Sequence, residues 1–159
     1  MARKKKAKKK KTQRTPGSPP GPFVLAINIC DTVFRDELTK KVSLIGLFST
    51  IRSFNFPCRH PSMHIYIALT GGHGRHKVDV RLVRTRDQKP VMGSVGPVEF
   101  ANPLQVVEMN IQWNNIGFAE PGGYSVDVLC DDGPVPIGSR KFHVIKEGEG
   151  KPNSGSKGK

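Results

Sequence analysis

The sequence has no long apolar run and no clear helical periodicity. Its 159 residues contain nothing close to the ~18 consecutive apolar residues that a membrane-spanning helix needs. The first apolar run, FVLAINIC at 23–30, is interrupted by Asn28 and lacks a small-residue cleavage site. We therefore expect a cytoplasmic protein with no membrane association, and the length suits one domain.

The motifs of common enzyme classes are also missing. The sequence contains no P-loop, no glycine-rich dinucleotide turn after a strand and no G-x-S-x-G element. The GGHG stretch at 71–74 precedes a strand-like run, so no helix N-terminus faces a phosphate there. These absences predict a protein that is not an enzyme and that uses no cofactor.

Cysteine is scarce and odd in number, which argues against a closed disulfide framework. Cys30 and Cys130 lie in strand-like runs, where a thiol behaves as a small buried hydrophobe. Cys58 lies elsewhere in the chain, and no local motif supplies a base that would activate any of the three thiols. Structural burial is the preferred interpretation, and a Cys30–Cys130 bridge remains an alternative.

Acidic residues are absent from the first 14 residues, which carry nine Lys and Arg. Residues 15–145 hold 13 Lys or Arg against 11 Asp or Glu, so this central part is nearly neutral. Before Phe23 there is almost no apolar residue to bury, and four prolines oppose a helix. We predict a disordered basic arm over 1–22 and a loose Gly-, Ser- and Lys-rich tail over 146–159.

Closely spaced cationic side chains attract polyanions and release counterions when they bind. Lysine contacts phosphate as a point charge, so the binding should be independent of base sequence. The alternative to polyanion binding is that the arm is a solvated extension that contacts nothing specific. The residues expected to contact nucleic acid, the ribosome or another polyanion are Arg3, Lys4, Lys5, Lys6, Lys8, Lys9, Lys10, Lys11 and Arg14.

The central part of the chain has the period of two that is typical of half-buried strands. Residues 63–70, 76–84 and 104–113 alternate apolar with polar or smaller side chains, and turn residues separate the runs. Residues 42–51, VSLIGLFSTI, are apolar on both faces and predict a central strand. Residues 34–41, FRDELTKK, could form a single helical turn.

The stretch FAEPGGYSVDVLCDDGPVPIGSRKFHV at 118–144 predicts two strands and the turn between them. Asp131 and Asp132 precede Gly133, and this composition suits a left-handed turn. Tyr124 follows Pro-Gly-Gly, as at the tyrosine corner of immunoglobulin-like domains, although Val126 replaces the expected cysteine. We predict a single antiparallel, immunoglobulin-like β-sandwich of seven or eight strands over 23–145.

Metal sites are not predicted, because the spacing of possible ligands is wrong. The pairs His60 with His64 and His73 with His76 lie too far apart along a strand, or in a turn where histidines are usually solvated. The carboxylates of the 31–37 and 131–133 loops do not match a calcium-binding loop. The candidates considered and set aside are Asp31, Asp36, Glu37, Cys58, Asp131 and Asp132.

Three stretches give a family resemblance: ICDTVFRDELTKKVSLIGLFSTI (29–51), FPCRHPSMHIYIAL (56–69) and the 118–144 stretch quoted above. Over about residues 24–145 the chain resembles an uncharacterised family of small bacterial proteins, a domain of unknown function. The resemblance implies a β-sandwich and an intracellular setting, and it implies no activity. The basic arm lies outside it.

These observations favour a non-enzymatic interaction module whose arm contacts a polyanion without sequence preference. The protein partner of the core is not indicated, although a free strand edge could pair with a partner strand. The alternative is a coat-like assembly subunit in which the arm neutralises a packaged genome.

Overall fold

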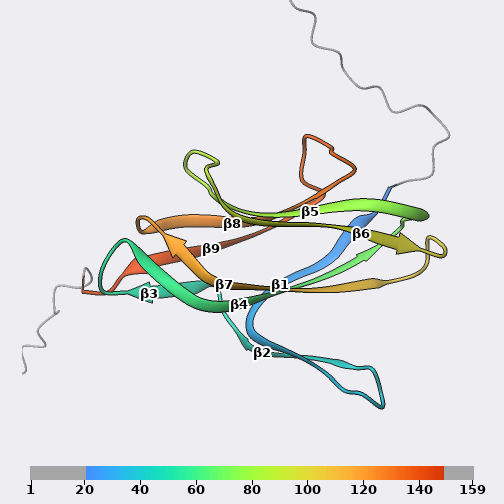
Figure 1. The fold of residues 1–159 in the computed structure, drawn as a ribbon, viewed down its shortest axis with the longest axis horizontal. Helices are drawn as coiled ribbons and strands as arrows, with labels where there is room; N and C mark the ends of the chain where they lie inside the picture. Colours follow the sequence, from blue (N-terminus) through green and yellow to red (C-terminus); the bar gives the residue numbers. More distant parts are fainter. Residues whose placement is uncertain (1–20, 149–159) are drawn as a thin grey trace, which may run out of the picture.

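The computed structural model describes residues 21–148, and these form strands and turns without a helix (Figure 1). The predicted arm and tail therefore lie almost entirely outside the described residues. The described residues contain no helix of the length and apolar character needed to cross a membrane. The strands are β1 (Phe23–Arg35), β2 (Val42–Leu47), β3 (Thr50–Ser53), β4 (Cys58–Thr70), β5 (Gly74–Arg84), β6 (Pro90–Phe100), β7 (Val107–Phe118), β8 (Gly122–Cys130) and β9 (Gly138–Lys146).

The strands form two sheets that face each other across one core. The first sheet has the order β2-β1-β4-β7 and the second has the order β3-β9-β8-β5-β6. The all-β prediction is confirmed, but the described chain has nine strands rather than seven or eight. The sheets are also not wholly antiparallel, because β3 pairs with β9 in parallel. The reason is that the chain crosses from the first sheet to the second between β2 and β3.

The core contains the apolar faces that the period of two predicted. Over residues 63–69 of β4 and 78–82 of β5, every second side chain points inward and is fully buried. Burial of one such side chain stabilises the fold by about 1.5–3 kcal/mol. Trp113 of β7 also links the sheets, since its indole N–H donates to Ser94 Oγ of β6 at 2.8 Å. The inward residues of the two strands are Met63, Ile65, Ile67, Leu69, Val78, Val80 and Leu82.

The prediction of a central strand over 42–51 is wrong. Gly46 adopts a φ of 68°, and the segment divides into β2 and β3 at the edges of different sheets. Ile45 and Leu47 of β2 are 55% and 60% exposed, whereas Ile51 of β3 enters the core. An apolar run on both faces is typical of a central strand. Here the run covers two short strands, and the chain passes from one sheet to the other between them.

Residues 34–41 form a β-hairpin turn and not a helical turn. Asp36 Oδ1 accepts hydrogen bonds from the backbone N–H of Leu38 and of Thr39, at 3.1 and 2.6 Å. The hydroxyl of Thr39 donates to the same oxygen at 2.7 Å. An aspartate that binds the backbone two and three residues later favours a turn over a helix. A similar contact precedes β7, where the backbone N–H of Leu104 donates to Asn102 Oδ1 at 3.0 Å. The strand begins at Val107 and not at Leu104, which is exposed.

The stretch 118–144 forms the predicted strands and turn. Asp131 and Asp132 have φ values of 51° and 56°, the left-handed region expected of this turn. The Tyr124 hydroxyl donates to the backbone carbonyl of Glu120 at 2.8 Å. Its ring stacks on Phe142 with the centroids 5.9 Å apart. This tyrosine therefore fixes the turn before β8 from inside the core.

Candidate functional site

The predicted polyanion-binding residues, Arg3 to Arg14, lie outside the described residues. Within residues 21–148 we consider four features as candidate functional sites. They are a His-Cys-Asp cluster, an Arg-carboxylate network, a polar sheet face and an exposed hairpin.

The His-Cys-Asp cluster lies where β5 begins and β8 ends. Ligand-capable atoms of His76, Cys130 and Asp131 lie within 4.8 Å of one another. Asp131 follows directly after β8, and its backbone N–H donates to the carbonyl of Lys77 at 2.9 Å. The backbone N–H of Lys77 donates in turn to Asp131 Oδ1, also at 2.9 Å. These two bonds hold the turn against β5 and direct its carboxylate toward His76.

The imidazole of His76 is held between two acceptors. Nδ1 lies 2.8 Å from Asp131 Oδ2, and Nε2 lies 3.1 Å from the carbonyl oxygen of His73. The two contacts fix the orientation of the ring, with Nδ1 toward the carboxylate and Nε2 toward the backbone. His73 therefore meets His76 through its backbone carbonyl and not through its own imidazole.

The thiol of Cys130 is not an activated nucleophile. Burial, a hydrogen bond to Asp131 and the charge of that carboxylate raise the pKa of Cys130 to about 12. Burial likewise raises the pKa of Cys30, which belongs to the other sheet. All three cysteines are free thiols, so the alternative of a Cys30–Cys130 bridge is wrong.

The remaining candidate ligands do not assemble. His60 and His64 lie on β4, and His64 Nδ1 is 3.0 Å from Asn110 Oδ1. Asp36 caps its own turn. Asp132 pairs with the ammonium of Lys77 at 2.7 Å. Among the described residues, the His76 group alone brings three possible ligands together.

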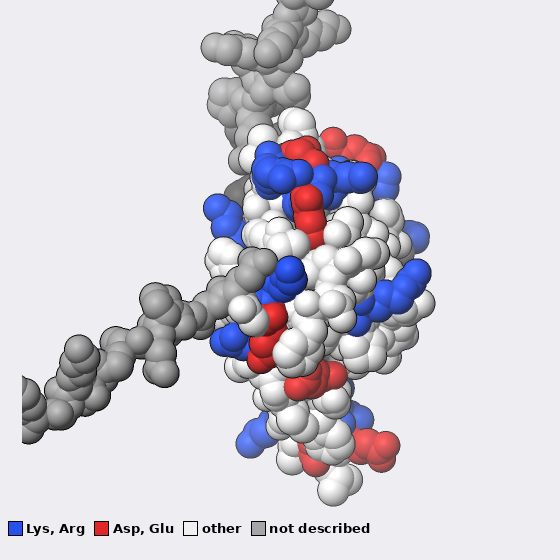
Figure 2. Space-filling model, turned by 90° about the vertical axis from the view of Figure 1, so that its left-hand side faces the viewer, with Lys and Arg blue, Asp and Glu red and all other residues white. Residues whose placement is uncertain are grey.

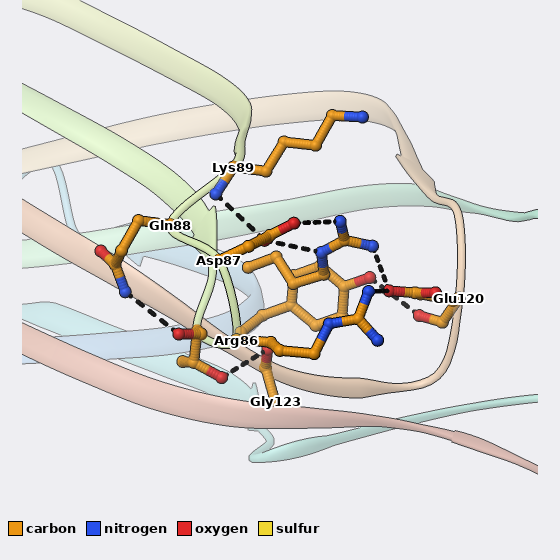
Figure 3. Close-up of polar contacts among 9 residues, drawn as sticks. Arg86, Asp87, Gln88, Lys89, Glu120 and Gly123 are labelled. Carbon is orange, nitrogen blue, oxygen red and sulfur yellow. Dashed lines mark hydrogen bonds and ion pairs between the residues drawn. The ribbon is translucent and has the colours of Figure 1, made fainter.

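An Arg-carboxylate network lies at the opposite end of β5, in the turns before β6 and β8 (Figure 3). The guanidinium of Arg84 contacts both Asp87 and Glu120, and Arg86 contacts Glu120 at 2.8 Å. The hydrogen bond from Arg84 lowers the pKa of Asp87 to about 2. Charged side chains of both signs gather at this end of the molecule (Figure 2).

A small pocket of about 230 Å³ adjoins this network. Tyr124 and Arg84 form part of its wall, together with Lys89, Pro90 and Val91. The Arg84 charge is already matched by two carboxylates, and Tyr124 is held by a backbone carbonyl. The network therefore joins the two turns beside this pocket.

A polar network covers the outer face of the first sheet. The Tyr66 hydroxyl donates to Glu108 Oε1 at 2.5 Å, and Arg35 donates to Glu108 Oε2 at 2.8 Å. These two hydrogen bonds hold the pKa of Glu108 below its usual value. Burial first, and the neighbouring carboxylate second, raise the pKa of Tyr66 to about 12. Because Arg35 ends β1, the network also anchors the β1–β2 hairpin to β7.

The β1–β2 hairpin projects from the body of the molecule (Figure 1). Beyond Cys30, β1 has β2 as its only strand partner in the described sheet. Phe34, Ile45 and Leu47 lie on one face of the hairpin by their pairing register, and each is more than half exposed. Among the described residues, β2 is one of the two edge strands of this sheet, and β7 is the other.

A model of the family of unknown function DUF6941 matches residues 25–145. The chain belongs to this family. The predicted resemblance is thus confirmed, and the match begins after the basic arm. No curated protein matches the chain.

One solved structure similar to this DUF6941 protein is a Bifidobacterium dentium β-glucuronidase in complex with coumarin-3-O-glucuronide. It is 15% identical, and the alignment covers 79% of this chain but only 18% of the glucuronidase, with a TM-score of 0.36. At that TM-score the likeness carries no argument about function.

Sequence reasoning missed the His76 cluster and the exposed hairpin. Cys130 and Asp131 are adjacent in the sequence, but His76 is distant, and only the β5–β8 register brings them together. The apolar pattern of 42–51 predicts a central strand, because the sequence alone does not reveal that β2 lies at the edge of its sheet.

Proposed function

We propose that this protein is a non-enzymatic interaction module that adds an extended strand of a protein partner to the free edge of β2. Its basic arm provides a second, sequence-independent contact with nucleic acid or another polyanion. The observation that carries the proposal is the projecting hairpin, with an unpaired strand edge beside exposed apolar side chains.

The chemistry of β2 supports this mode of binding. A strand edge offers unpaired N–H and C=O groups to an incoming strand, and neighbouring side chains provide selectivity. Ile45 and Leu47 place apolar surface next to that edge. The ion pair of Arg35 with Glu108 orients the hairpin without covering this surface.

Three further assignments belong to the proposal. An immunoglobulin-like sandwich is supported by the Tyr124 corner and by two facing sheets. A cytoplasmic location is supported by three free thiols, which suit a reducing compartment. A non-enzymatic role is supported by the matched charges around Arg84 and by the raised pKa of the Cys130 thiol, which in the metal-free protein disfavours the nucleophilic thiolate.

Site-specific photocrosslinking tests the strand-addition proposal in bacterial cells. A photoreactive phenylalanine analogue replaces Leu47 in the full-length chain, and a matched control carries it at Val135, which is 71% exposed in the turn before β9. We expect a discrete protein adduct from position 47 that is absent from position 135. Equal crosslinking at both positions, or none at 47, contradicts the proposal.

Fluorescence anisotropy with duplex DNA and structured RNA tests the arm. The full-length protein is compared with a full-length variant in which the nine arm cations are replaced by Gln. Binding should disappear in the variant, and for the wild type log K should fall with log salt with a slope of up to about −8 on duplex DNA. Retained binding by the variant would place the nucleic-acid surface on the nearly neutral core.

A further inference from the structure

We propose that His76, Cys130 and Asp131 form a binding site for one divalent transition-metal ion of the zinc class. The three side chains offer an imidazole nitrogen, a thiolate sulfur and a carboxylate oxygen, the donor types that bind zinc in proteins. This proposal is independent of the strand-addition function, because β2 belongs to the other sheet.

The separations of the donor atoms are close to those of a tetrahedral site. Zinc bonds of ~2.0–2.3 Å place neighbouring ligand atoms roughly 3.3–3.7 Å apart. The His76 Nδ1 to Asp131 Oδ2 distance is 2.8 Å, and all three donors lie within 4.8 Å of one another. An ion between Nδ1 and Oδ2 therefore requires these two atoms to move slightly apart, which rotation of the side chains can supply.

The outer hydrogen bonds match those that orient metal ligands. A ligating histidine usually donates its other ring N–H to a carbonyl or carboxylate, and His76 Nε2 does so to His73. Nδ1 faces Asp131 Oδ2, so an ion between them meets one nitrogen and one oxygen donor. Asp131 Oδ1 is held by the backbone N–H of Lys77, which leaves Oδ2 directed toward the imidazole. Two of the three donors are thus already oriented toward each other.

The ion has an entry path and an open coordination position. A pocket of about 580 Å³ borders the cluster, and its wall comprises Arg75, His76, Lys77, Asp131 and the β6 residues Val95, Gly96 and Pro97. The ammonium of Lys77 does not compete for the site, because it pairs with Asp132. Three protein ligands leave a fourth position toward this pocket for water or for a carboxylate or imidazole of a partner.

Metal titration of the reduced full-length protein tests the site. Zn²⁺ is titrated in competition with a chromophoric chelator, and Co²⁺ binding is followed in parallel by its absorption spectrum. We expect one ion per chain and a near-ultraviolet thiolate-to-cobalt charge-transfer band. The spectrum is recorded on the wild-type protein, so it does not depend on the folding of any variant.

Matched substitutions locate the ion. Cys130→Ser and His76→Gln should each weaken Zn²⁺ binding by more than about tenfold, because loss of even an outer partner often costs that much. Cys58→Ser and His143→Gln are the controls and should bind as the wild type does. Substoichiometric binding, a cobalt complex without the thiolate band, or unchanged binding in Cys130→Ser would each overturn the site and leave His76 with Asp131 as an ion pair only.

Discussion

The hydroxyl of Tyr124 donates to the backbone carbonyl of Glu120, four residues earlier, at 2.8 Å. The tyrosine is 1% exposed, and its ring also contacts Phe118 and Phe142. The chain therefore enters β8 through a turn that is closed by a side chain from the core.

Replacement of Tyr124 by Phe should lower the free energy of unfolding by about 1–2 kcal/mol. The ring contacts remain, but the bond is lost and a partly buried carbonyl loses its donor. Chemical denaturation measures the change, and Tyr66→Phe is the control. The Tyr66 hydroxyl binds Glu108 on the outer face of the sheet, so its loss should cost less. An equal loss in both variants would contradict a special role for the corner.

His60 should make the protein less stable in mild acid. Burial lowers the pKa of His60 below its ordinary value of 6.5, and Nε2 is buried without a hydrogen-bond partner among residues 21–148. The unfolded chain therefore binds a proton at a higher pH than the folded chain does. The contribution of His60 to stability is fully present above pH 6.5 and is lost as the pH falls through the folded pKa.

Thermal unfolding measured across this pH range tests the effect. His60→Gln should flatten the dependence of the unfolding temperature on pH. The control is Ser62→Ala, two residues along the same strand, which removes no titratable group and should leave that dependence unchanged. A wild-type profile retained by His60→Gln would exclude His60 as its source.

Truncation of a side chain in the core of β4 should lower the free energy of unfolding far more than truncation of a side chain in the exposed hairpin. Leu69 is fully buried, and Leu69→Ala should cost about 2–5 kcal/mol through lost transfer energy and the cavity that remains. Leu38 is 93% exposed at the hairpin tip, and Leu38→Ala should change stability by less than about 0.5 kcal/mol. Similar losses from the two variants in denaturant unfolding would mean that the tip packs against something.

The inward faces of β4 and β5 could be predicted from sequence because both strands are half buried. Their period of two follows directly from the pleat, so Ile65 and Val80 are correctly placed in the core. The Asp131-Asp132-Gly133 turn could be predicted too, because its residues are the ones that tolerate a left-handed backbone.

The parts that sequence reasoning missed depend on pairing between distant strands. The apolar pattern of 42–51 is the same whether a strand lies in the centre or at an edge, and only the sheet order decides. In the same way His76 meets Cys130 because Val78 is paired with Cys130 in the β5–β8 register. Local sequence does not fix that register.

Arg84 should couple more strongly to Glu120 than Arg86 does. Both guanidinium groups contact the same carboxylate, but the Arg84 side chain is 14% exposed and that of Arg86 is 72% exposed. Solvent and salt screen the second pair more than the first. Two double-mutant cycles, each combining Glu120→Gln with Arg84→Met or Arg86→Met, measure the coupling by denaturant unfolding.

The Arg84–Glu120 coupling should be the larger of the two and should persist at high salt, whereas the Arg86–Glu120 coupling should fade. Asp87 also binds Arg84, so Asp87→Asn serves as the control for the arginine's second partner. If both couplings are equal and both vanish with salt, Arg84 is an ordinary surface cation. The link between the turns before β6 and β8 then rests on Thr85, whose backbone N–H and hydroxyl both donate to the carbonyl of Gly123.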